Sequence, residues 1–273
     1  MKSNQETKQN VKKKSGGHGT QEWSVKTVNC VTGCSHNCLY CYAKGMAVRF
    51  KQVTPEEWPI ERVRPHDVAK RHRMYSGQVM FPSSHDITPY NLVSCIKVLK
   101  KLLIVGNRVL VVSKPHIQCI EKLCEELAEY RDKILFRFTI GAQDNKILSY
   151  WEPNSPSYVE RRASLVHAYD QGFKTSVSVE PMLDATNIDD LISDLSPYVT
   201  DAIWIGTMNH LGRFGKSSDV VMKQAIAMIR RGQTNASIRA IYRRHKDNPL
   251  IKWKKEIKKV VGIPIPKQNG LDI

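Results

Sequence analysis

The sequence has no long run of apolar residues. Although 41% of its 273 residues are hydrophobic, none of its apolar stretches approaches the roughly 18 residues that a membrane-spanning helix needs. Its first residues, MKSNQETKQNVKKKSGGHG, contain no apolar segment of the kind found in a secretory signal peptide. These absences predict a cytoplasmic protein that does not have a membrane as a partner.

Acidic residues are few relative to basic ones. The chain has 26 Asp and Glu against 42 Lys and Arg, which gives a formal net charge of +16. The basic residues gather near both ends, as Lys8, Lys12, Lys13 and Lys14 and as Arg239, Arg243, Arg244, Lys246, Lys252, Lys254, Lys255, Lys258 and Lys259. This excess is typical of a protein that contacts a polyanion, and DNA or RNA is the expected partner. The alternative is a solvated basic surface that only keeps the protein soluble.

Cysteine is scarce as well, but it is not scattered. Three of the seven cysteines, Cys34, Cys38 and Cys41, lie within the stretch CSHNCLYCYA. A reducing cytoplasm disfavours disulfides, so clustered thiols there are more often metal ligands or redox groups. A zinc site usually has four ligands in two separated pairs, and the second pair is missing here. Cys30 or His36 could supply a fourth ligand, so zinc stays open.

The remaining cysteines fit a structural role. Cys95, Cys119 and Cys124 fall on helical patterns and are interpreted as small apolar residues. A thiol redox protein is a further interpretation of the Cys38-x2-Cys41 spacing. The additional Cys34 argues against it.

Short apolar runs alternate with longer helical patterns along the chain. Strands are predicted at 23–29, 78–81, 108–113, 133–140, 175–179 and 202–205, and helices at 43–50, 90–103, 117–130, 157–169, 188–195 and 220–230. This alternation predicts an α/β fold of parallel βαβ units, as a partial or full barrel or an open doubly wound sheet. In each of these folds the active site lies at the carboxyl ends of the strands.

Three segments are expected from these patterns. Residues 1–20 form a disordered basic tail, residues 21–232 form the core domain, and residues 233–273 form a basic helical C-terminal extension. Within the extension, 236–260 is predicted to be helical, with no strand after it.

The spacing Cys-x3-Cys-x2-Cys, with Tyr40 before the last cysteine, resembles the defining motif of the radical S-adenosylmethionine (SAM) superfamily. The resemblance implies a partial (β/α)6 TIM-like barrel and a [4Fe–4S] cluster held by Cys34, Cys38 and Cys41. Three cysteines leave one iron open to S-adenosyl-L-methionine, since such clusters normally take four. One-electron reduction would then cleave SAM to methionine and a 5′-deoxyadenosyl radical, which abstracts hydrogen from the substrate. A flavodoxin- or ferredoxin-like electron donor is implied as a partner.

Residues from about 34 to 206 are similar to the branch that includes spore photoproduct lyase. The similarity is carried by CLYCYA at 38–43, SSHDI at 83–87, SK at 113–114, and RFT at 137–139 followed by WEP at 151–153 and RR at 161–162. It implies that Tyr40 packs near the adenine of SAM, that His85 and Thr139 contact the cofactor, that Lys114 pairs with its carboxylate, and that Asp86 lies close by.

Two further cofactor-binding candidates come from the residues themselves. Arg137 lies on an apolar strand, and a buried arginine needs an anionic or hydrogen-bonding partner. Glu180 ends the fifth predicted strand, so its carboxylate would point to the mouth of a barrel and bind the ribose or cap a loop.

The chain departs from the lyase pattern at Ser83. The lyase has a cysteine at this position, which donates a hydrogen atom to the product radical, and a serine hydroxyl is a much poorer donor. The resemblance therefore does not carry over the repair reaction. The alternative function is a non-catalytic nucleic-acid-binding protein stabilised by zinc or an iron–sulfur cluster.

Overall fold

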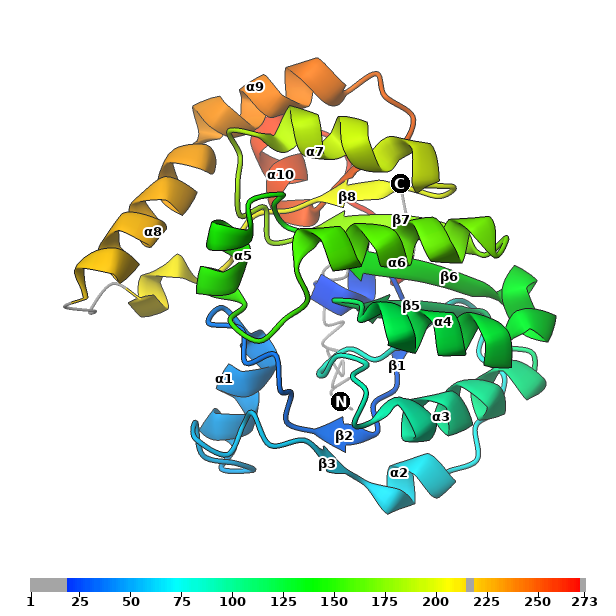
Figure 1. Ribbon diagram of the computed structural model, residues 1–273. Helices are drawn as coiled ribbons and strands as arrows, with labels where there is room; N and C mark the ends of the chain where they lie inside the picture. Colours follow the sequence, from blue (N-terminus) through cyan, green and yellow to red (C-terminus); the bar gives the residue numbers. More distant parts are fainter. Residues whose placement is uncertain (1–18, 215–218, 271–273) are drawn as a thin grey trace, which may run out of the picture.

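The computed structural model describes residues 19–214 and 219–270 as an α/β fold built on a seven-stranded parallel sheet (Figure 1). The strand order in the sheet is β1-β4-β5-β6-β7-β8-β9. These strands are β1 (Lys26–Thr27), β4 (Val79–Phe81), β5 (Val109–Ser113), β6 (Ile134–Thr139), β7 (Lys174–Val179), β8 (Ile203–Ile205) and β9 (Ile251–Trp253). The predicted α/β class and parallel sheet are confirmed, and because β1 and β9 are edge strands the sheet is a partial barrel that does not close.

Two predictions about the edge strands need correction. The first strand covers only Lys26–Thr27, because Trp23 and Ser24 turn back and donate backbone hydrogen bonds to Thr20. At the other edge, the C-terminal extension is not helical throughout, because β9 pairs in parallel with β8. The apolar residues of β9 flank a single lysine, which is too short a pattern to stand out within a basic segment.

The helices lie mainly along one face of the sheet. They are α1 (Tyr42–Arg49), α2 (Pro65–Ala69), α3 (Leu92–Ile104), α4 (Ile117–Glu126), α5 (Asn145–Trp151), α6 (Tyr158–Asp170), α7 (Ile188–Leu195), α8 (Val220–Gly232), α9 (Asn235–His245) and α10 (Lys255–Val261). Short 3-10 helices are η1 (Gly19–Glu22), η2 (Ala128–Lys133), η3 (Ser196–Tyr198) and η4 (Leu211–Phe214). Figure 1 shows α3, α4, α6 and α7 on the outer face, while α1, α5 and α8 stand at the end toward which the strands point.

The cysteine motif lies in the long connection between β1 and β4. This connection also contains an antiparallel pair, β2 (Val31–Thr32) and β3 (Arg62–Val63). Of the predicted tail, residues 1–18 lie outside the described part of the chain, and Gly19 and Thr20 begin η1. No helix within 19–214 and 219–270 has both the length and the apolar character to cross a bilayer.

The two faces of the sheet are packed differently. On the outer face, Phe136 and Phe138 of β6 join the large core formed with the helices. On the inner face a smaller cluster contains Trp23, Met80, Leu110, Leu135, Ala202 and Trp204. Since alternate residues of a strand face opposite sides, residues 135, 137 and 139 of β6 share the inner face, and the last of them lies nearest the carboxyl end.

Candidate active site

The cysteine loop has a defined conformation before it enters α1. Gly33 has a φ of +88°, and a Cβ atom there would lie 2.4 Å from the carbonyl oxygen of Ile60. The loop is fixed by backbone hydrogen bonds from Cys34 to Trp58 (2.9 Å) and from Leu39 to Trp151 (2.9 Å). Cys41 is the N-cap of α1, and its Sγ accepts from the backbone N–H of Lys44. The loop therefore delivers its cysteines in fixed positions.

One pocket of about 620 Å³ gathers these cysteines at the carboxyl ends of the strands. Of the site residues predicted from the sequence, it is lined by Cys34, Cys38, Tyr40, Cys41, His85, Asp86, Lys114, Thr139 and Glu180. Burial raises the pKa of all three thiols, and for Cys38 it raises it to about 12. Such thiols are neutral at physiological pH, and a bound metal would have to displace their protons.

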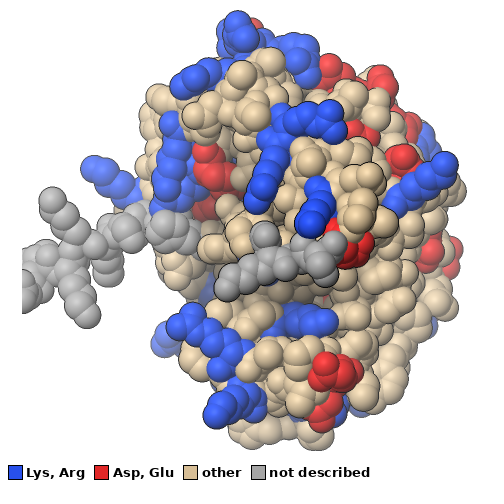
Figure 2. Space-filling model, turned by 90° about the vertical axis from the view of Figure 1, so that its left-hand side faces the viewer, with Lys and Arg blue, Asp and Glu red and all other residues tan. Residues whose placement is uncertain are grey.

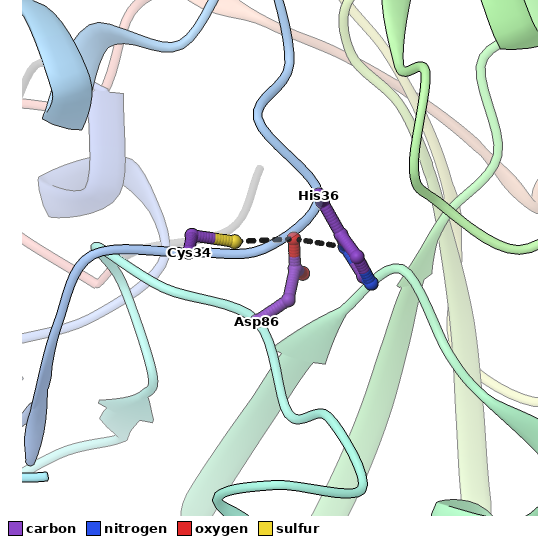
Figure 3. A group of neighbouring side chains, drawn as sticks. All are labelled: Cys34, His36 and Asp86. Carbon is purple, nitrogen blue, oxygen red and sulfur yellow. Dashed lines mark hydrogen bonds and ion pairs between the residues drawn. The ribbon is translucent and has the colours of Figure 1, made fainter. Parts of the chain in front are cut away.

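Asp86 lies at the centre of the polar contacts beside Cys34. Its Oδ2 lies 2.9 Å from His36 Nδ1 and 3.8 Å from Cys34 Sγ (Figure 3). Its Oδ1 accepts from Ser113 Oγ (3.1 Å) and from the backbone N–H of Lys114 (2.8 Å). Burial alone would raise the pKa of Asp86, but the Lys114 and His36 charges and these hydrogen bonds hold it well below its usual range.

Lys114 follows β5 and carries the positive charge of this part of the pocket. Its Nζ lies 3.6 Å from Asp86 Oδ2 and 5.7 Å from the centroid of the Tyr40 ring. Burial would lower the pKa of Lys114, but the Asp86 carboxylate and the other acidic groups around it raise it well above its usual range. The side chain is thus a largely enclosed cation that stays charged at physiological pH in this part of the pocket.

Tyr40 is held by a second buried ion pair. Its hydroxyl donates to Glu152, whose other carboxylate oxygen lies 2.5 Å from Arg161 Nη2. Both side chains of the pair are completely buried. Burial, reinforced by the Glu152 charge, raises the pKa of Tyr40 well above its usual range, so this hydroxyl remains a donor.

His85 and Thr139 also line the pocket. His85 lies in the connection after β4, and Thr139 lies at the end of β6. His85 is buried, and its Nε2 accepts from the backbone N–H of Cys30 (3.3 Å). Thr139 is the last residue of β6, and its carbonyl oxygen accepts from Arg161 Nη1 (3.2 Å).

Acidic residues around Lys254 also line the pocket. Lys254 Nζ lies 3.0 Å from Glu22 and 3.4 Å from Glu180, and it donates to the carbonyl oxygen of Gly19. Glu256 Oε1 accepts from the backbone N–H of Thr207 (3.0 Å). Burial, followed by the negative charge of Glu180, raises the pKa of Glu256 to about 7.

Arg137 does not belong to the pocket wall that the described residues form. Its guanidinium lies between the rings of Trp23 and Trp204, at 4.7 and 5.3 Å from their centroids. It donates to Ser176 Oγ (2.9 Å) and pairs with Asp201 (3.1 Å), which precedes β8. Arg137 lies two residues before the end of β6 and packs against the tryptophans of the inner-face cluster, so the structure does not bring it together with the other predicted site residues in the pocket lining.

The basic C-terminal segment is only partly a surface feature. Lys254 and Lys258 are buried, and the ammonium of Lys258 lies 5.9 Å from the ring of Trp204. Arg244 pairs with Asp189. Nucleic-acid contact stays a prediction, but the buried Lys254 and Lys258 do not belong to the basic surface on which it rests. The early lysines of the chain, Lys8, Lys12, Lys13 and Lys14, lie outside the described residues.

Several pocket residues were not found by the sequence analysis. They are Glu22, His210, Arg213, Lys255, Glu256 and Lys259. They reach the pocket from η1, from the loop after β8, from η4 and from α10. No motif marks them, because they come together only when the N-terminal helix contacts the end of β9.

The comparisons with known proteins begin with sequence. No family model matches the chain. The uncharacterized protein ORF301 of Acidianus two-tailed virus is 26% identical over 204 residues, which cover 70% of this chain and 67% of that protein.

Solved structures share the fold. A variant of spore photoproduct lyase with bound AdoMet and dinucleoside spore photoproduct aligns with a TM-score of 0.55 and 15% identity, over 83% of this chain and 75% of that one. SuiB from Streptococcus suis, bound to S-adenosylmethionine, aligns with a TM-score of 0.54 and 9% identity, over 90% of this chain. The aligned part is 54% of SuiB, so the chain spans about half of that protein. The chain therefore has the radical SAM fold, in a form like that of spore photoproduct lyase.

Proposed function

We propose that this protein is a radical SAM enzyme that holds a [4Fe–4S] cluster with Cys34, Cys38 and Cys41 and binds S-adenosyl-L-methionine beside it. The observation that carries the proposal is that these three cysteines line one pocket at the carboxyl ends of a parallel sheet with the radical SAM fold. The pocket volume of about 620 Å³ lies within the range of about 300–1,000 Å³ that is common for small-molecule sites.

The three motif thiols do not lie close enough together to bind one zinc ion as they stand. Two sulfur ligands of one zinc ion, each at about 2.3 Å, can be at most about 4.6 Å apart. Among the described residues, the group of three donor atoms that lie within 4.8 Å of one another consists of Cys34, His36 and Asp86, and the three motif thiols do not form such a group. A cluster distributes its cysteines over several iron atoms, so it accepts the wider spacing.

The residues of the pocket have separate roles in this proposal. The bound cluster and SAM would supply reductive cleavage of the sulfonium and a 5′-deoxyadenosyl radical for hydrogen abstraction. Lys114, held beside Asp86, would offer its ammonium to the SAM carboxylate, and Tyr40, held by Glu152, would offer its ring to the adenine. His85, Asp86, Thr139 and Glu180 line the same pocket. In this proposal the first three would border the cofactor, and Glu180 would accept a hydrogen bond from a ribose hydroxyl. Arg137 supports the interior instead.

A polyanionic substrate, DNA or RNA, is part of the proposal. The pocket is bordered by Arg213, Lys255 and Lys259, and the net charge of the chain is +16. Figure 2 looks onto this end of the sheet and shows Lys and Arg side chains above and below the central hollow. Ser83 lies in the pocket without a thiol, so the reaction differs from the lyase repair reaction in its hydrogen donor. The cytoplasmic location remains a prediction from the sequence.

The test is cleavage of SAM by anaerobically reconstituted, dithionite-reduced protein, with 5′-deoxyadenosine detected by mass spectrometry. We expect product from the wild type and none from Cys41→Ala, whose iron content should also fall. Assays with and without single-stranded and duplex DNA and RNA would cover enzymes that need their substrate for cleavage. Full iron retention by Cys41→Ala would contradict the ligand assignment.

A second candidate is a non-catalytic zinc-stabilised nucleic-acid-binding protein. It is favoured by one observation, the donor atoms of Cys34, His36 and Asp86, which lie within 4.8 Å of one another. The variant His36→Ala separates the two functions. It should abolish stoichiometric zinc binding if this candidate is correct, and it should leave iron loading intact if the cluster is held by the three cysteines.

A further inference from the structure

Helix α1 has one buried face and one exposed apolar face. Its buried residues, Ala43 and Ala47, pack in a small cluster with Trp58 and Val53. On the exposed side, Met46 is 44% exposed and Phe50, which follows the last turn, is 62% exposed. Residues four apart on a helix lie on the same face, so these two side chains form one stripe.

The stripe begins next to the cysteines. Cys41 is the N-cap of α1, and Leu39, which is 37% exposed, lies between Cys38 and Cys41. At 1.5 Å per residue, the distance along the helix from Cys41 to Phe50 is about 14 Å. In Figure 1, α1 stands at the open end of the sheet and not among the helices that cover the outer face. A protein that contacts this stripe would thus lie directly beside the cysteine loop.

Basic residues predominate in the segment that carries the stripe, and the first acidic residues after it are Glu56 and Glu57. Residues 23–55 contain Lys26, Lys44, Arg49 and Lys51 and no Asp or Glu. Arg49 and Lys51 are exposed and flank Phe50. Exposed apolar side chains with a basic border favour a partner whose surface is apolar at the centre and acidic around it.

We propose that the α1 surface, made of Leu39, Met46, Arg49, Phe50 and Lys51, is the docking site of a small acidic electron-transfer protein that reduces the cluster. The inference rests on the proposed function, which needs one electron for each cleavage of SAM. The reduced partner loses one electron and the cluster gains it, and no atom is transferred. A flavin or iron–sulfur carrier of acidic charge is the class of protein that fits this surface.

The experiment compares two reductants on the full-length, reconstituted protein. Reduced flavodoxin is the acidic protein reductant, and dithionite is the small reductant that needs no docking surface. The test variants are Met46→Glu/Phe50→Glu and Arg49→Glu/Lys51→Glu. Their controls carry the same changes of charge on exposed residues elsewhere, Val93→Glu/Ile104→Glu and Arg71→Glu/Lys97→Glu. Tyr42 is left unchanged because it lines the pocket.

We would measure the rate at which each reductant bleaches the cluster absorbance. We would also measure the affinity of oxidised flavodoxin for the immobilised protein. We expect both test variants to slow reduction by flavodoxin by at least about 10-fold, because docking and electrostatic steering are lost. Reduction by dithionite should stay within about twofold, and both controls should behave as the wild type does, as expected for surface substitutions away from the docking site.

The outcomes separate this inference from the proposed function. If both test variants bind flavodoxin and are reduced by it as the wild type is, the docking site is overturned. It is also overturned if the rates of reduction by flavodoxin and by dithionite fall equally, because that result means damage to the cysteine loop. A wild type that binds no cluster would contradict the proposed function, and the affinity for flavodoxin would still decide whether α1 is a docking surface. The protein could instead self-associate through the stripe. Self-association that is abolished in Met46→Glu/Phe50→Glu and unaffected by flavodoxin would assign the stripe to a second copy of the chain and overturn the inference.

Discussion

Glu256 shows how one buried carboxyl group can make the stability of the fold depend on pH. Burial and the Glu180 charge raise its pKa from an ordinary 4.5 to about 7. Between these values the folded protein holds a proton that the unfolded chain has released. Raising the pH through this window therefore lowers the free energy of unfolding. The positive charge of Lys254 opposes this shift in the pKa of Glu256. Burial also raises the pKa of Glu180.

The substitution Glu256→Gln tests this sign. Glutamine keeps an oxygen for the Thr207 N–H but does not titrate. In urea unfolding at about pH 5 and about pH 8, we expect the wild type to lose on the order of 1 kcal/mol more stability than the variant over this interval. Parallel pH dependences of the two proteins would contradict the raised pKa.

At the scale of elements, strand β9 ties the C-terminal segment to the sheet. It pairs with β8 in parallel, and Lys254 directly after it joins Glu22 of η1 and Glu180 after β7. Deleting residues 236–273 would remove these contacts together with buried Ile251, Trp253 and Ile257. We expect the truncated protein to lose its cooperative thermal unfolding transition, because each buried large side chain alone contributes about 2–5 kcal/mol. A truncated protein with a wild-type melting temperature would show that the segment is an independent appendage.

The central strands of the sheet could be predicted from the sequence, and the full extent of the edge strands β1 and β9 could not. Strands β5 and β6 are mainly apolar segments of five and six residues, and nearly all of their residues are buried. The cysteine spacing likewise identifies its own pocket, because those ligands are close together in the chain. Lys254 gave no such signal, since it contacts Gly19 and Glu22 of η1, more than 200 residues earlier in the chain. The sequence analysis assigned Arg137 to the cofactor because a buried arginine needs an anionic or hydrogen-bonding partner. The sequence pattern does not show which residue or ligand that partner is.

The whole molecule combines a basic net charge with an uneven distribution of that charge. Lys254 and Lys258 are buried and Arg244 is paired, so these cations are poorly placed for a polyanion. Arg213 and Lys259, in contrast, are exposed and line the pocket. If a nucleic acid enters the pocket, these two side chains should contact its phosphates.

Salt dependence measures those contacts. Each phosphate contact contributes about 0.7 to the slope of the logarithm of affinity against the logarithm of salt concentration for single strands. We expect Arg213→Gln/Lys259→Gln to weaken the binding of a single-stranded oligonucleotide and to reduce this slope by about 1.4. The control Arg71→Gln/Lys97→Gln removes two exposed charges outside the pocket lining and should leave the slope nearly unchanged. Equal reductions in both variants would mean that the nucleic acid responds only to the total charge of +16 and does not enter the pocket.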